Sequence, residues 1–283
     1  MIPAGFDYVR AKSVREVLNT LAAGDSKLLA GGHSLIPLMR FRLAQPGKLV
    51  DIGGLDELRG ISAKGKSVRI GAATTYRDIL DDTLIAERYP LMIEATLGIG
   101  DTQVRNRGTV GGGLAHADPA SDMPAVMLAL DATFNLRSKA GKRSVPAREF
   151  FQGPFETAMK EDELFYEVVL PAPPKKAGMS YVSFEQLASG YPIAAAAAVV
   201  TKSRKSIKTV TLALTGVGEK AYLANVPDAV GTHGDDAALD AALSAVADAV
   251  VVNSDVHASA EYRAHLARVA AKRAIQTALG RAG

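Results

Sequence analysis

The sequence of 283 residues contains no cysteine. The chain therefore cannot form a disulfide, use a thiolate nucleophile, or ligate an iron–sulfur cluster or a thiolate zinc site by itself. Any metal site would have to use histidines, and none of the five follows the HxxxH or HExxH spacing of a zinc site. Glu261 and His265 are better explained as a surface pair one helical turn apart. The histidines, which together predict no metal site, are His33, His116, His233, His257 and His265.

The sequence also lacks a strong charge of either sign and any long apolar run. Lysine and arginine number 33 against 30 acidic residues, and the basic residues are scattered, so no nucleic-acid partner is expected. The longest apolar stretch, residues 193–200, is mostly alanine and too short to span a membrane, and the N-terminus lacks the apolar segment of a signal peptide. We therefore expect a cytoplasmic protein with no membrane span. With 48% hydrophobic residues, the chain can form one or two domains.

The first fifty residues predict a small α/β lobe. Ser13 and Glu16 have the spacing of a capping box, and the apolar face that follows predicts a helix over residues 13–23. A strand, a helix and a second strand are predicted next, which together make a βαβ unit. Their residues are 27–30, 35–43 and 49–52.

From about residue 56 short alternating segments separated by glycine-containing turns predict a mixed or antiparallel sheet, with brief helices near Arg77 and Pro90. The expected strands are residues 68–72, 132–136 and 164–170. Residues 171–178 contain three prolines and two lysines and predict a linker or domain boundary. Beyond it we expect strands at residues 179–187, 194–201 and 207–215, and alanine-rich helices at residues 236–250 and 259–279.

Two motifs match familiar enzymes in their letters but not in their context. Residues 60–67 match a phosphate-binding P-loop, yet the residues that follow alternate as a strand does, so Lys64-Gly65-Lys66 is better explained as a hairpin tip. Gly32-His33-Ser34 resembles the start of a hydrolase nucleophile elbow, but Ile36 replaces the second glycine. Ser34 is better explained as the N-cap of the following helix.

Two glycine clusters remain as candidates for a binding site. Residues 29–34 place two glycines between a strand and a helix, where successive N–H groups and the helix N-terminus can face a pyrophosphate. Four glycines at residues 108–113 permit the close approach of a bulky ligand, and Thr109 adds a hydroxyl. Asp122 can either accept hydrogen bonds from a polyol or simply cap a helix at residues 123–130. Taken alone, this second cluster is equally well explained as a glycine-rich loop packed on the sheet.

The motifs together resemble the FAD-binding medium subunits of molybdenum hydroxylases, a family that includes the medium subunit of carbon monoxide dehydrogenase and the FAD domain of xanthine dehydrogenase. The resemblance covers nearly the whole chain in order. It rests on Ala30-Gly31-Gly32-His33-Ser34-Leu35-Ile36-Pro37, Val50-Asp51-Ile52, Gln103-Val104-Arg105-Asn106-Arg107-Gly108-Thr109-Val110-Gly111-Gly112, Asp118-Pro119-Ala120-Ser121-Asp122 and Ala260-Glu261-Tyr262-Arg263.

The resemblance implies an α+β fold of the PCMH/VAO-type FAD-binding class. This fold has a small N-terminal α/β lobe, a lobe with an antiparallel sheet, and a C-terminal domain with a three-stranded sheet and a helix bundle. The implied FAD-binding domain is residues 1–176, with lobes at about 1–55 and 56–176, and the C-terminal domain is residues 177–283.

The resemblance also implies the residues that hold noncovalent FAD. Two backbone segments would bind the diphosphate, Asp122 the polar atoms of the ribityl or flavin, Ile99 and Phe165 would line the cofactor, and Tyr191 would lie against the isoalloxazine. The two segments are Leu28, Leu29, Ala30, Gly31, Gly32, His33, Ser34 and Leu35, and Thr109, Val110, Gly111, Gly112 and Gly113. The chain departs from the usual family pattern at Gly113, Gly190 and Glu185-Gln186.

In this family a large molybdopterin subunit oxidises the substrate and a small subunit with [2Fe-2S] clusters conducts electrons to the FAD subunit. The resemblance thus implies both partners, most simply in a dimer of heterotrimers, with electrons passing from FAD to an external acceptor. The absence of cysteine and of a catalytic triad fits that role. Two alternatives remain, a self-sufficient flavin-dependent oxidase or dehydrogenase and a P-loop nucleotide hydrolase that uses residues 60–67.

Overall fold

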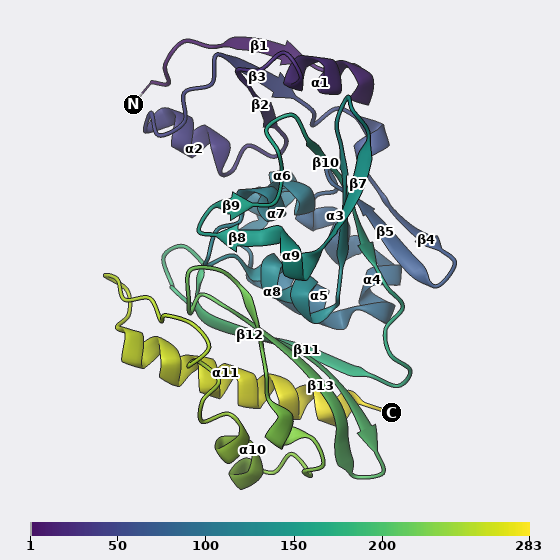
Figure 1. The fold of residues 1–283 in the computed structure, drawn as a ribbon, viewed down its shortest axis with the longest axis vertical. Coiled ribbons are helices and arrows are strands. Elements are labelled where there is room, and N and C mark those ends of the chain that lie inside the picture. The colour runs from purple at the N-terminus through teal and green to yellow at the C-terminus, as the bar shows by residue number, and fades with distance from the viewer. Residues whose placement is uncertain (1) are drawn as a thin grey trace.

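In the computed structural model, which describes residues 2–283, the N-terminal lobe is a parallel three-stranded sheet with two helices, at the top of Figure 1. The strand order is β1-β3-β2, and both pairings are parallel. The predicted βαβ unit is confirmed, and β1 is an additional strand. The elements are β1 (Asp7–Arg10), α1 (Val14–Leu21), β2 (Ser26–Leu29), α2 (Leu35–Arg40) and β3 (Lys48–Asp51).

The two helices of this lobe are shorter than predicted. Ser13 caps α1 by accepting a hydrogen bond from the Glu16 N–H at 3.2 Å, but the Glu16 carboxylate accepts from the Lys12 N–H instead of completing the capping box. Helix α2 ends at Arg40 rather than at residue 43. Arg42 has a φ of 60°, a left-handed conformation that cannot continue a right-handed helix.

The middle lobe contains an antiparallel five-stranded sheet in the order β4-β5-β10-β6-β7, which confirms the predicted sheet type. Its strands are β4 (Ile61–Lys64), β5 (Ser67–Gly71), β6 (Thr133–Arg137), β7 (Lys142–Pro146) and β10 (Leu164–Leu170), with a small β8 (Phe151–Gly153) and β9 (Glu156–Thr157) hairpin. Its helices are α3 (Tyr76–Asp81), α4 (Thr83–Arg88), α5 (Pro90–Gly98), α6 (Thr102–Arg107), α7 (Val110–His116), α8 (Asp122–Ala129) and α9 (Ala147–Phe150).

The residues that match the P-loop motif, 60–67, lie on the β4–β5 hairpin. Lys64 pairs with Ser67 across the turn, and Gly65 has the left-handed φ of 61° that such a turn needs. The segment opens no helix, so it cannot present the helix N-terminus that a P-loop offers to phosphates. The hairpin interpretation is confirmed, and residues 60–67 do not form a P-loop.

Helix α8 is buried along its whole length, from Asp122 to Ala129. It packs against α5 and α7 of the middle lobe on one side and against strands of the C-terminal lobe on the other. Because the apolar side chains of α8 lie on all sides of the helix, it can be stable only when other elements cover every side. This packing fixes the start of the helix, where Asp122 lies, at the boundary between the lobes.

The C-terminal lobe is an antiparallel sheet of four strands in the order β11-β12-β13-β14. The prediction of three strands is wrong, because residues after the Gly216 turn return as the short β14 and pair with β13. The elements are β11 (Gly178–Glu185), β12 (Pro192–Ser203), β13 (Ser206–Thr215), β14 (Tyr222–Ala224), α10 (Asp236–Ala242) and α11 (Ala260–Arg281).

Of the expected helix bundle, the long helix α11 covers one face of this sheet (Figure 1, yellow) and the short α10 packs against α11. Fully buried alanines on β12 and on α11 make the close contact possible. The helix predicted at residues 236–250 ends at Ala242, where turns with i to i−3 hydrogen bonds begin. The Ser244 hydroxyl donates to the Ala241 carbonyl and so competes with continued helix.

Each lobe has its own hydrophobic core, and the first strands of the C-terminal sheet also contribute to the core of the middle lobe. Residues 171–177 connect β10 with β11, as the proline-rich sequence predicts. No helix within residues 2–283 is long and apolar enough to cross a bilayer.

Candidate functional site

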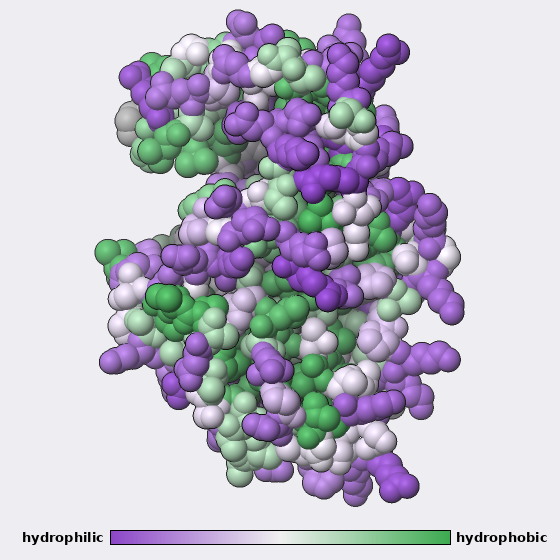
Figure 2. Space-filling model, in the orientation of Figure 1, coloured by the Kyte–Doolittle hydropathy of each residue, from purple (hydrophilic) through white to green (hydrophobic). Residues whose placement is uncertain are grey.

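The two glycine clusters lie against each other where the N-terminal and middle lobes meet, through residues 76 to 82 positions apart in the sequence. A Cβ atom built on Gly31 would lie 2.1 Å from the Arg107 carbonyl oxygen, and one built on Gly112 would lie 3.9 Å from the Ala30 Cβ. Only a glycine at position 31 permits this approach. Figure 2 shows a notch in the surface between the part of the chain that contains α2 and the rest of the molecule.

The turn from β2 to α2 offers main-chain donors without acceptors. Gly32 has a φ of 82°, and within residues 2–283 no backbone or side-chain acceptor bonds the N–H groups of residues 31–35. The residues are half-buried or exposed. Ser34 occupies the N-cap position of α2, but its hydroxyl makes no capping hydrogen bond, which corrects the role predicted for it. Several free N–H groups in one glycine turn form a concavity suited to an anion.

The second glycine cluster is a helix start rather than an open loop. Thr109 is the N-cap of α7 and accepts the Gly112 N–H on its hydroxyl at 3.2 Å. The N–H groups of Val110, Gly111 and Gly113 bond carbonyl groups of the chain at 3.0, 2.9 and 3.0 Å. The structure therefore already uses these donors. Its glycines instead place bare backbone beside the glycine turn of residues 31–35. The contact of residues 109–113 with FAD stays a prediction.

Gly111 and Gly113 are required by packing inside the middle lobe. A Cβ on Gly111 would lie 2.5 Å from the Ala72 Cβ and 2.8 Å from the Ala72 carbonyl oxygen at the end of β5. A Cβ on Gly113 would lie 2.2 Å from the Tyr76 hydroxyl. The interpretation of this cluster as glycine packed on the sheet is therefore correct for Gly111.

Asp122 is a buried carboxylate and not the N-cap of α8, a position that Ser121 holds. The side chain of Asp122 accepts a hydrogen bond from the Tyr181 hydroxyl at 2.7 Å. Burial raises the pKa of Asp122 to about 7, and the Tyr181 hydrogen bond opposes that rise. The alternative role of Asp122 as a plain cap is therefore wrong, and a buried acceptor remains.

Three tyrosines lie near enough to this carboxylate for its charge to affect their pKa, and only one of them was expected. Tyr191, 43% exposed, precedes β12, Tyr76 lies on α3, and Tyr181 lies on β11. Burial raises the pKa of each, and the charge of Asp122 raises it further. Glu185 lies near enough to raise the pKa of Asp122. The sequence reasoning missed Tyr76 and Tyr181, since buried tyrosines at alternating or helical positions look like ordinary core residues.

Ile99 lies in the loop after α5, which a single arginine holds. The Arg105 Nη1 donates to the carbonyls of Leu97, Ile99 and Gly100 at 3.2, 3.0 and 2.9 Å. The backbone of Gly190, beside Tyr191, packs against this loop, and a Cβ there would lie 3.3 Å from the Gly98 carbonyl oxygen. The loop with Ile99 and the turn with Tyr191 are thus neighbours.

Phe165 is a core residue. Its ring is 4% exposed and packs with Phe134 and Phe150 at centroid distances of 5.3 and 5.7 Å. The expected contact of Phe165 with the cofactor therefore stays a prediction, and its observed partners are the aromatic rings of the middle lobe.

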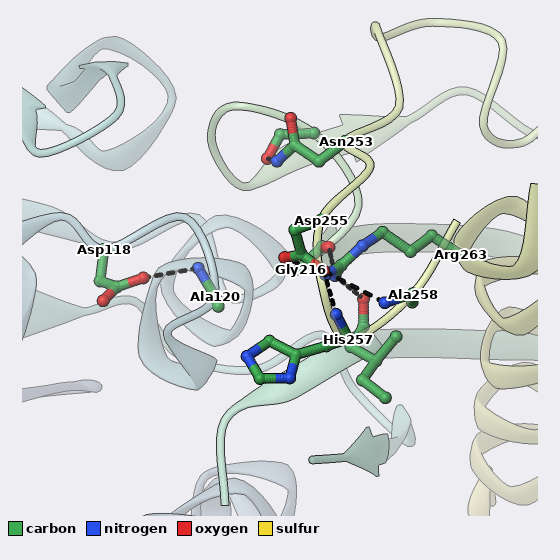
Figure 3. Close-up of polar contacts among 10 residues, drawn as sticks. Asp118, Ala120, Gly216, Asn253, Asp255, His257, Ala258 and Arg263 are labelled. Atoms are coloured by element: carbon green, nitrogen blue, oxygen red, sulfur yellow. Dashed lines mark hydrogen bonds and ion pairs between the residues drawn. The ribbon is translucent and has the colours of Figure 1, made fainter. Parts of the chain in front are cut away.

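The C-terminal lobe holds the chain just before Asp122. The Thr215 hydroxyl donates to the carbonyls of Pro119 and Ser121 at 3.0 and 2.8 Å, and the Gly216 N–H donates to Pro119 at 3.0 Å. The Asp118 carboxylate closes this turn by accepting the Ala120 N–H (Figure 3).

Arg263 of α11 binds the ends of strands β12 and β13 next to this turn. Its Nη1 donates to the Ile193 and Gly216 carbonyls at 2.8 and 2.7 Å, and its Nη2 pairs with Asp255 at 2.6 Å. Asp255 in turn accepts the N–H groups of His257 and Ala258, as Figure 3 shows. The guanidinium thereby joins the strand ends to the loop before α11.

Among residues 2–283 no group of three or more histidine, aspartate or glutamate side chains gathers as metal ligands would. The donor set of the site is instead main-chain N–H groups, a carboxylate and tyrosines. These are groups that suit a phosphate, a polyol and an aromatic ring system.

Comparison with known proteins identifies the same two parts of the chain. Residues 4–173 match the family described as the FAD binding domain in molybdopterin dehydrogenase, and residues 180–278 match the CO dehydrogenase flavoprotein C-terminal domain.

Individual relatives match over the full length. The carbon monoxide dehydrogenase medium chain of Afipia carboxidovorans is 40% identical, with 100% of this chain and 99% of the relative covered. The glyceraldehyde dehydrogenase medium chain of Sulfolobus acidocaldarius is 37% identical over 98% of this chain and 99% of the relative. A carbon monoxide dehydrogenase structure from Hydrogenophaga pseudoflava superposes with a TM-score of 0.96, at 38% identity and with both chains fully covered. The chain therefore belongs to the family of FAD-binding medium subunits of CO dehydrogenase-type molybdenum hydroxylases, which are oxidoreductases.

Proposed function

We propose that the junction of the two glycine segments holds the diphosphate of noncovalently bound FAD. The single observation that carries this proposal is the row of N–H groups at residues 31–35, which no acceptor within the described chain satisfies. Charge-assisted hydrogen bonds from such donors are strong. The close contact of Gly31 with the Arg107 carbonyl fixes how far the second segment lies from these donors.

The polar and aromatic groups near Asp122 would then surround the rest of the cofactor. Asp122 would accept a hydrogen bond from a hydroxyl of the ribityl chain, and Tyr191 and Ile99 would lie against the ring system. Tyr191 suits this role because a partly exposed aromatic ring can stack on a flavin at low entropic cost. Phe165 would support the site from the core.

Bound FAD would supply the redox chemistry, which can exchange both single electrons and electron pairs. The chain itself binds and orients the cofactor, and its buried walls exclude water from one side of the site. We propose that electrons arrive from [2Fe-2S] clusters of a small partner subunit and leave from FAD to an external acceptor. The absence of cysteine supports this, because the chain cannot ligate such a cluster alone.

The assembly that follows contains this chain, the small iron–sulfur subunit and a large molybdopterin subunit, most simply as a dimer of heterotrimers in the cytoplasm. We assign residues 1–176 to FAD binding and residues 177–283 to the C-terminal domain. The two family matches, at residues 4–173 and 180–278, support that boundary.

The substrate of the complex would be selected in the large subunit. Two relatives of nearly equal identity, 40% and 37%, have names with different substrates, carbon monoxide and glyceraldehyde. Such similar medium chains with different substrates support a medium chain that carries electrons and does not bind the substrate.

Titration of the purified chain with FAD tests the proposal. We expect stoichiometric binding, seen as quenching of flavin fluorescence, and release of intact FAD on denaturation. No saturable binding by the folded chain would refute the proposed site.

A second measurement separates the electron-transfer subunit from a self-sufficient flavin oxidase. The FAD-loaded chain should be reduced by the reduced iron–sulfur subunit and not by organic substrates alone. Rapid bleaching of the flavin absorbance by a small organic substrate, without partner subunits, would favour the oxidase.

A further inference from the structure

We infer that Tyr181 is a positioning residue that orients the Asp122 carboxylate toward FAD and links the C-terminal lobe to the cofactor site. This inference rests on the proposed FAD site and adds a residue to it from the other domain. Tyr181 lies on β11, whereas Asp122 begins α8 of the middle lobe.

The contact between the two side chains is short and almost completely buried. The Tyr181 hydroxyl donates to the Asp122 Oδ1 at 2.7 Å, and the two residues are only 7% and 5% exposed. No other side chain within residues 2–283 donates to this carboxylate. Because Tyr181 occupies one oxygen, it fixes the plane of the carboxylate and leaves the second oxygen for another donor.

The backbone that carries Asp122 cannot supply this orientation by itself. The Thr215 hydroxyl holds the preceding turn through the Pro119 and Ser121 carbonyls, and this contact fixes the position of the main chain. These main-chain contacts do not fix the side-chain torsion angles of Asp122. An aspartate at the first position of a helix has several rotamers, and the Tyr181 hydroxyl selects one of them.

Tyr181 is itself anchored by an ion pair at the end of the C-terminal helix. The Tyr181 N–H donates to the Glu94 Oε2 at 2.7 Å, and the Arg281 Nη1 pairs with the Glu94 Oε1 at 2.5 Å. Arg281 also donates to the Met179 carbonyl at 2.7 Å. A connected set of contacts thus runs from α11 through α5 and β11 to Asp122.

Burial and the Tyr181 hydrogen bond act in opposite directions on the charge of Asp122. The groups that perturb Asp122 or that its charge perturbs are Tyr181 and Glu185 on β11, Tyr76 on α3, and Tyr191. None of these described groups is a cation. Burial therefore raises the pKa of Asp122 to about 7, and the Tyr181 hydrogen bond lowers it by favouring the ionised form. The ionised form is the better acceptor for a cofactor hydroxyl.

Replacement of one hydroxyl tests the inference. In Tyr181→Phe the Glu94 contact with the backbone remains, and only the hydrogen bond to Asp122 is lost. We expect the Kd for FAD to rise roughly tenfold, as for the loss of one charge-assisted hydrogen bond. The Kd, measured by fluorescence quenching from about pH 5 to pH 9, should show its midpoint about one pH unit higher than in the unmodified chain.

Tyr222→Phe is the matched control. Tyr222 is another tyrosine of the same sheet, and its hydroxyl donates to the Val246 carbonyl at 3.1 Å, away from Asp122. We expect its Kd for FAD and its pH midpoint to match those of the unmodified chain. In an Asp122→Asn background, Tyr181→Phe should no longer move the pH midpoint.

Several outcomes would overturn the inference. One is equal FAD affinity and equal pH midpoint in Tyr181→Phe and Tyr222→Phe. Another is a melting temperature of FAD-free Tyr181→Phe so far below that of Tyr222→Phe that unfolding accounts for lost binding. Failure of the unmodified folded chain to bind FAD would instead refute the proposed function on which the inference rests.

Discussion

The contact between Gly31 and Arg107 makes Gly31→Ala the sharpest test of how the two glycine segments form one site. The added Cβ would lie 2.1 Å from the Arg107 carbonyl oxygen, whereas real Cβ atoms essentially never approach closer than 3.0 Å. The segments must therefore separate by at least about 0.9 Å, the difference between those distances. The opposing atoms are backbone, so a side-chain rotation cannot relieve the clash.

Two effects follow from that separation. Overpacking of this kind costs about 1–3 kcal/mol of unfolding free energy. A shift of this size also misaligns main-chain donors toward the diphosphate, and a hydrogen bond to a charged group contributes about 1.5–3 kcal/mol. We therefore expect the Kd for FAD to rise about tenfold or more.

Gly5→Ala is the control, because it is the same substitution in the same lobe and a Cβ there meets nothing within 4 Å. FAD affinity is measured by fluorescence titration and unfolding free energy by urea denaturation of the FAD-free chain. If Gly31→Ala binds FAD as tightly as Gly5→Ala and is equally stable, the two segments do not form a fixed site.

Three further predictions concern other parts of the chain. Lys66→Ala at the β4–β5 hairpin should leave FAD affinity unchanged in titration, and the unmodified chain should bind no ATP, because the segment opens no helix. Burial raises the pKa of Asp122 from 3.8 to about 7, so the folded FAD-free chain binds this proton more tightly than the unfolded chain does. Its unfolding free energy should fall by up to about 3 kcal/mol between pH 4 and pH 7, and urea denaturation of Asp122→Asn should show a smaller fall. Arg263→Met should lower the unfolding free energy by about 2 kcal/mol, since it removes the hydrogen bonds that the buried guanidinium donates to the Ile193 and Gly216 carbonyls; an unchanged urea midpoint would contradict this.

The local pattern of the sequence was sufficient for most of the individual elements. The strand–helix–strand unit of the first lobe, the β4–β5 hairpin and the alanine-rich strand β12 lie within a few residues of their predicted bounds. Capping residues, turn glycines and apolar periodicity act over a few residues, so they are visible in a single sequence. The glycine motifs, through their resemblance to a family, also indicated the FAD-binding fold, which the family matches confirm.

Sequence periodicity failed where tertiary contacts outweigh local preference. The residues after Ala242 are alanine-rich, yet they form turns. The Tyr222 hydroxyl donates a hydrogen bond to the Val246 carbonyl in one of these turns. The short β14 exists only because β13 offers a free edge beside it. Apolar periodicity reveals neither contact, since β14 pairs with β13 residues 8 to 12 positions away and Tyr222 is 24 positions from Val246.

The composition of the chain by itself excluded cluster ligation, because no residue arrangement can replace absent cysteine thiolates. Only the tertiary structure decided what each glycine does. Gly31 faces Arg107 across the lobe boundary, whereas Gly111 packs on Ala72 within one lobe, although both belong to equally glycine-rich motifs. Likewise only the fold brings Tyr181 to Asp122. Sequence determines which groups a residue carries, but the environment that buries a carboxylate or exposes an N–H comes from segments distant in the chain.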